Sequence, residues 1–90
     1  MQLDNIFKKA LASHQTGQLD QAAKLYRLIL NTDGEHAQAF NNLGAIFMSC
    51  DRLNDALVCF QNAINARADF FEAHINLARA FKKLGDFARA

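Results

Sequence analysis

Two asparagines in this sequence have the chemistry and the spacing to recognise another molecule. Asn42 and Asn76 are 34 residues apart and lie at the same place in two similar segments, so we expect their amides to stand in register, one structural repeat apart. An amide offers both a donor and an acceptor, which suits the backbone of a bound peptide. The competing hypothesis is that these amides only bond neighbouring helices.

Basic side chains add a second kind of recognition. Lys8, Arg79, Lys82 and Lys83 would favour an acidic peptide or a C-terminal carboxylate if they share one surface. The alternative interpretation is an ordinary solvated helix face.

Residues for catalysis or metal binding are not arranged in any pattern. His14, His36 and His74 are far apart, and Cys50 and Cys59 do not form a CxxC pair. The sequence has no nucleophile motif, no glycine-rich phosphate loop and no paired acids. We therefore predict no enzyme activity, no cofactor and no metal, with the thiols serving as small apolar side chains.

Composition sets the broad class. The chain has 90 residues, of which 51% are hydrophobic, and a net charge of +1, so nothing favours nucleic acid or a membrane surface as partner. There is no apolar run of about 20 residues. Asp4 lies where a secretory signal would have a basic segment, and we predict a cytoplasmic protein.

The elements that position these residues repeat along the chain. A shift of 34 residues aligns Ala22, Ala56 and Ala90, and also Gly17, Asp51 and Gly85. With no proline and few glycines, apolar residues at helical spacing predict helices. The expected ranges are 2–15, 19–31, 37–49, 53–65 and 71–83, with a sixth helix opening at Phe87.

Small residues at the repeated positions indicate how the helices pack. Gly44 and Ala56 would allow two antiparallel helices to approach closely, and Phe60 would fill the space beside them. We therefore expect an all-α solenoid of stacked helix pairs. The same packing role is predicted for the equivalent residues of the other repeats, namely Ala22, Tyr26 and Ala78.

These residues resemble a known family. Leu43-Gly44 followed by Phe47, then Ala56 and Phe60, is similar to the tetratricopeptide repeat (TPR) signature. The resemblance implies helical hairpins in a right-handed superhelix with a concave, peptide-binding groove. It divides a single domain, 1–90, into repeats at 3–36, 37–70 and an incomplete 71–90. We expect a fragment of a longer array, with self-association through the uncapped C-terminal face as a further possibility.

The resemblance also implies which side chains line the groove. It does not favour heat-shock chaperone tails as ligands, because Phe7 and Leu11 replace the lysine and asparagine of the family's carboxylate clamp. Met48 is expected to add an apolar strip beside Phe7, Leu11 and Ile75, unless these residues are core. The expected groove residues are Lys8, Gln38, Asn41, Asn42, Met48, Asn76, Arg79 and Lys82.

Three functions fit this sequence. The first is a non-catalytic scaffold module that binds a protein or an extended peptide. The second is the N-terminal substrate-recruiting arm of a glycosyltransferase, sulfotransferase or methyltransferase. The third is a secretion chaperone. The style of the repeats, with His14-Gln15-Thr16-Gly17 and the segment 26–30, is similar to bacterial proteins.

Overall fold

The computed structural model describes the backbone of residues 2–89 and the side chains of residues 2–86. These residues form five α-helices and no strand, which confirms the predicted all-α class. The first four helices begin and end within one residue of the predicted ranges. The helices are α1 (Leu3–Gln15), α2 (Leu19–Thr32), α3 (Ala37–Ser49), α4 (Leu53–Ala66) and α5 (Phe71–Arg89).

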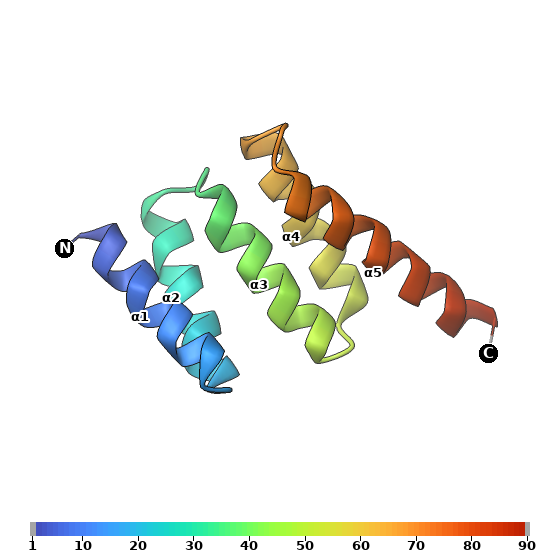
Figure 1. Ribbon diagram of the computed structural model, residues 1–90, viewed down its shortest axis with the longest axis horizontal. Coiled ribbons are helices and arrows are strands. Elements are labelled where there is room, and N and C mark those ends of the chain that lie inside the picture. Colours follow the sequence, from blue (N-terminus) through green and yellow to red (C-terminus); the bar gives the residue numbers. More distant parts are fainter. Residues whose placement is uncertain (1, 90) are drawn as a thin grey trace.

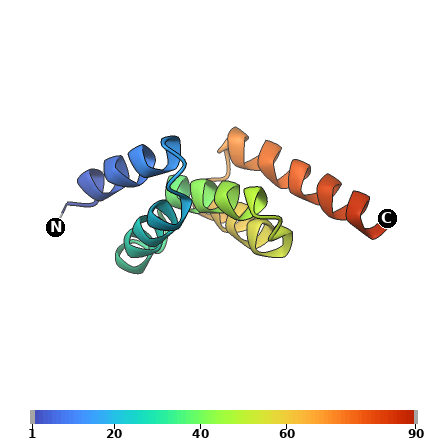
Figure 2. The ribbon, with the colours of Figure 1, turned by 90° about the horizontal axis from the view of Figure 1, so that it is seen from below.

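The helices form two layers. In Figure 1, α1, α3 and α5 lie in front, and α2 and α4 lie behind them. Figure 2 shows α3 set back between α1 and α5, so the front layer is concave. We call the exposed side of α1, α3 and α5 the inner face. The molecule is elongated, with extents of 46 × 28 × 18 Å, as expected for helix pairs stacked in one direction.

One repeated position decides where the first helix of a pair ends. Gly17 ends the turn after α1 with φ +81°, the left-handed conformation that glycine adopts without strain. Asp51 has the same role after α3, with φ 60°. The third equivalent, Gly85, lies inside α5, which continues to Arg89. The predicted break at Gly85-Asp86 and the sixth helix at Phe87 are therefore wrong.

The physical reason is that glycine permits a left-handed turn but does not impose one. At Gly17 the turn is stabilised because α2 folds back and packs against α1. No helix of the described residues packs back against the C-terminal half of α5 in this way, so the backbone keeps its helical hydrogen bonds through Gly85.

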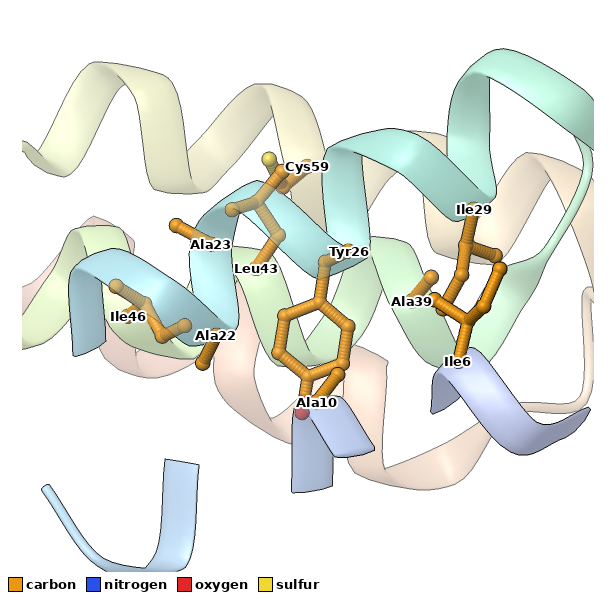
Figure 3. Close-up of a cluster of buried hydrophobic side chains, with 10 residues drawn as sticks. All are labelled: Ile6, Ala10, Ala22, Ala23, Tyr26, Ile29, Ala39, Leu43, Ile46 and Cys59. Carbon is orange, nitrogen blue, oxygen red and sulfur yellow. The ribbon is translucent and has the colours of Figure 1, made fainter. Parts of the chain in front are cut away.

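The core forms where the two layers meet. Figure 3 shows Tyr26 at the centre of the largest cluster, with Ala10 of α1 and Ala39 and Leu43 of α3 around it. The equivalent aromatic of the next repeat, Phe60, is also completely buried. Both rings occupy the space left by small residues on the facing helix.

Gly44 allows the closest approach between α3 and α4. A Cβ atom at this position would lie 2.6 Å from Cε1 of Phe60, which is closer than van der Waals contact permits. Ala22 and Ala56 have no exposed surface, so the predicted packing role holds for these residues. Ala78 is exposed, because no helix of the described residues covers that side of α5, so its packing role stays a prediction.

None of the five helices is both long enough and apolar enough to cross a membrane, as far as the described residues show.

Candidate peptide-binding face

The structure places four of the predicted groove residues in solvent. Lys8 extends from α1, Gln38 from α3, and Arg79 and Lys82 from α5, and all four are exposed. Cationic side chains are therefore present at both ends of the stack, with a neutral amide between them. This arrangement can offer donors to an extended acidic ligand.

The asparagine prediction needs a correction. Asn76 does not act in register with Asn42; its Nδ2 donates a hydrogen bond of 3.0 Å to Oδ1 of Asn41. Asn41 is 1% exposed and Asn76 is 8% exposed, so this amide pair lies between α3 and α5. Neither residue is a free groove side chain, because each is placed on the side of its helix that faces the other. The competing hypothesis, in which the amides bond a neighbouring helix, therefore explains the positions of Asn41 and Asn76.

Asn42 lies at the junction of the first two repeats. It is half-buried, and its amide is close to the hydroxyl of Tyr26. Burial raises the pKa of Tyr26, and the neighbouring Asn42 amide opposes that shift. Asn42 therefore lies near Tyr26 and is only partly accessible to a ligand.

Tyr26 has a second polar partner that the sequence reading missed. Its hydroxyl lies 3.2 Å from Nδ1 of His14, which is itself half-buried. The sequence contained a signal for this bond, because the equivalent residue of the next repeat, Phe60, has no hydroxyl group. A buried tyrosine, unlike a phenylalanine, needs a hydrogen-bond partner.

The predicted apolar strip of Met48, Phe7, Leu11 and Ile75 is divided between core and surface. Met48 packs against the buried cluster of Ala56 and Phe60, as the alternative interpretation proposed. Phe7 also joins the core, with its ring centroid 6.1 Å from that of Tyr26. Ile75 is 55% exposed.

The two thiols have different surroundings. Cys50 is exposed, and Cys59 is buried. Burial raises the pKa of Cys59 to about 11, with a smaller contribution in the same direction from the Asp55 carboxylate and an opposing one from Arg27. Among the described residues, no three His, Cys, Asp or Glu side chains are grouped so that they could hold a metal ion.

The fold is that of an α-helical repeat protein. It has stacked helix pairs with a 34-residue period, small residues at the close contacts and a concave front layer. A family model described as "TPR repeat" matches residues 44–85. The chain therefore belongs to the tetratricopeptide repeat family, as the sequence resemblance predicted.

Among the similar proteins, one that is named for the same repeat supports this assignment. Human tetratricopeptide repeat protein 8 is 31% identical over 82% of this chain. The Drosophila melanogaster protein O-mannosyl-transferase Tmtc3 is 31% identical over 90% of the chain. The chain spans only 14% and 9% of the lengths of these two relatives.

The fold is similar to that of a solved structure described as the first TPR of Spaghetti (RPAP3) bound to HSP90 peptide SRMEEVD. It superposes with a TM-score of 0.88, and the match covers 93% of this chain and 67% of that chain, at 17% identity. At this identity the similarity establishes the fold.

Proposed function

We propose that this chain is a non-catalytic module whose inner face binds an extended segment of a partner protein in the cytoplasm. The observation that carries the proposal is that α1, α3 and α5 form one concave layer (Figure 2) and that each of these helices carries exposed polar or charged side chains, namely Lys8, Gln38, Arg79 and Lys82. The similar fold of the RPAP3 domain, which was solved with a peptide, supports this use of the surface.

The charge of the inner face favours an acidic segment. Arg79, Lys82 and Lys83 follow one another along α5, and all three are exposed. Lys83 reaches Asp51 at a nitrogen–oxygen distance of 3.9 Å, a solvent-exposed pair that is worth little and can be exchanged for a ligand carboxylate. Gln38 and the accessible part of Asn42 then serve the peptide backbone.

Chaperone tails of the HSP90 type are not the expected ligand. Phe7 is partly buried in the core, where the clamp of the family would place a lysine. Asn76 bonds to Asn41 and cannot replace the clamp's arginine as a charged group. We expect recognition of an acidic segment within a chain, without a requirement for a free C-terminus.

Selection from a displayed peptide library tests this proposal. Peptides selected by the wild type should be enriched in Asp and Glu, and Arg79→Ala with Lys82→Ala should weaken their binding at least about tenfold, since charged hydrogen bonds contribute about 1.5–3 kcal/mol each. Asn54→Ala, at an exposed position on α4, is the matched control and should bind normally. If the Arg79→Ala, Lys82→Ala variant bound the selected peptides as well as the Asn54→Ala control does, the proposed surface would be wrong.

The recruiting-arm hypothesis is the second candidate, because one relative, Tmtc3, is named as a transferase. In that case the same inner face would hold the substrate of a catalytic domain elsewhere in a longer chain. The gene decides between the two: a transferase domain in the reading frame that contains residues 1–90 supports the arm, and its absence excludes it.

A further inference from the structure

A second charged surface lies where α2 begins and α3 ends. These two helix ends are in the lower part of Figure 1. A hollow of about 290 Å³ opens there, and we call it the basic pocket. Ala23 and Ile46 contribute apolar surface to it. Its chemically distinctive lining residues are Asp20, Lys24, Arg27, Phe47, Cys50 and Arg52.

Two arginines from different repeats meet at one aromatic ring in this pocket. The guanidinium carbon of Arg52 lies 5.0 Å from the ring centroid of Phe47, and that of Arg27 lies 5.7 Å from it. Cation–π contacts of this kind hold the side chains in place without occupying the N–H groups at the guanidinium edge. Both guanidinium groups are therefore placed beside the same ring before any ligand binds.

The cations outnumber the acids around the pocket. Arg52 pairs with Asp55 at 2.7 Å, and Asp20 contributes a second carboxylate to the lining. Within the part of the chain that the structure describes, Lys24 and Arg27 form no ion pair. Their charges remain available to a ligand.

The repeat pattern indicates that the fold does not require these cations. The positions 34 residues after Lys24 and Arg27 are Val58 and Gln61, on the equivalent helix of the next repeat. That helix packs in the same way without a positive charge at either position. The basic pocket therefore occurs once, at the junction of the first two repeats, and is not part of the repeat scaffold.

We propose that the basic pocket binds a phosphorylated side chain of a protein partner. Two guanidinium groups, one of which already pairs with Asp55, and one ammonium group suit a ligand with a charge near −2 and three acceptor oxygens better than they suit a single carboxylate. Free phosphate has the same chemistry, and the two sources are distinguished below. The charged residues of this site belong to α2 and to the turn between α3 and α4, and none of them is among the groove residues of the inner face, so either site can fail without the other.

Cys50 supplies a reporter for the pocket, because it lines the hollow and is exposed. Iodoacetate and iodoacetamide both alkylate a thiolate, which forms a carbon–sulfur bond and displaces iodide, but only iodoacetate is an anion. The ratio of the two rates cancels the thiolate fraction of Cys50 and reports the local potential. Cys59 is buried, with its pKa raised to about 11, and peptide mass spectrometry separates the two sites.

The first measurement compares that rate ratio between variants. Arg27→Gln with Arg52→Gln should lower the iodoacetate-to-iodoacetamide ratio at Cys50 at least about threefold, with a smaller decrease at high salt. The matched control is Lys9→Gln with Arg67→Gln, which removes the same charge. Arg67 is also an arginine over an aromatic ring, 4.2 Å from the centroid of Phe70. An equal fall in the control would overturn the pocket as a local anion site.

The second measurement identifies the ligand by protection of Cys50 from iodoacetamide. A degenerate peptide library centred on phosphoserine should slow alkylation at least about threefold. The same library with serine should not, and the Arg27→Gln, Arg52→Gln variant should lose the protection. Inorganic phosphate at the same concentration should protect less. Equal protection by inorganic phosphate would overturn the peptide as ligand, and no protection by either would overturn the site.

Discussion

Helices α3 and α5 occupy the same place in successive repeats, yet their surroundings differ. Asn41 on α3 is 1% exposed, and the residue 34 positions later, Ile75 on α5, is 55% exposed. Gly44 is buried, and its equivalent, Ala78, is exposed. The more apolar residue of the first pair is the exposed one, so burial here follows position in the stack and not the hydrophobicity of the side chain.

The difference is confined to one side of each helix. Ala39 and its equivalent, Ala73, are both 0% exposed, because each faces a preceding helix. On the opposite side of α5, Phe71 is 77% exposed and Phe81 is 57% exposed. Apolar surface of this kind is typical of an interface. That it mediates self-association stays a prediction, which light scattering at high protein concentration tests directly.

The largest expected effect comes from enlarging the small residue at the close contact. Gly44→Leu should lower the free energy of unfolding by about 1–3 kcal/mol or more, because even a Cβ atom meets the ring of Phe60. Ala78→Leu should change it by less than about 0.5 kcal/mol, since this position is exposed. Urea denaturation of the two variants measures both values.

Similar losses in the two variants would mean that α5 is covered in solution, and the contrast between the helices would then be absent. Gly44→Ala serves as the intermediate control. It adds only the Cβ atom, so its loss should be smaller than that of Gly44→Leu.

The helix boundaries were predictable because they depend on local chemistry. Gly17 and the Asp51 corner mark chain reversals, and the 34-residue period assigns the packing positions of Ala22 and Ala56. The break at Gly85 was not predictable, because the same residue is compatible with a turn or with a continued helix. Only packing against a following helix separates the two states.

The repeat pattern could not predict the hydrogen-bonded pair of Asn41 and Asn76. The period aligns Asn42 with Asn76, but the hydrogen bond joins Asn41 to Asn76. Which of two adjacent asparagines faces the next helix depends on how α5 is rotated against α3, and sequence spacing does not encode that rotation. The pattern therefore located the right helices and selected the wrong partner.

The second prediction concerns this buried pair. Asn41→Ala should lower the free energy of unfolding by about 1–3 kcal/mol, because it leaves the Asn76 amide buried without its partner. The equivalent change on α5, Ile75→Asn, should be within about 0.5 kcal/mol of neutral, since an exposed amide is hydrated. Thermal denaturation resolves this contrast, because 1 kcal/mol corresponds to about 4–8 °C in a chain of this size.

A double-mutant cycle of Asn41→Ala, Asn76→Ala and the double variant isolates the bond itself. The double variant should cost less than the sum of the two single variants, since no polar group is then left unpaired. If the two single changes simply add, the hydrogen bond contributes nothing to stability.

The smallest expected effect has opposite signs at two equivalent glycines. Gly17→Ala should destabilise the protein by about 1–2 kcal/mol, because alanine is strained at φ +81°. Gly85→Ala should stabilise it by about 0.5–1 kcal/mol, because the residue is helical and a Cβ atom would enter open space. Neither glycine has a neighbouring atom within 4 Å of that Cβ position, so backbone conformation alone separates the two results. A loss of stability at Gly85 would show that α5 turns there in solution, as the chain does at Gly17 after the end of α1, and that the two ends of the stack are more alike than the structure describes.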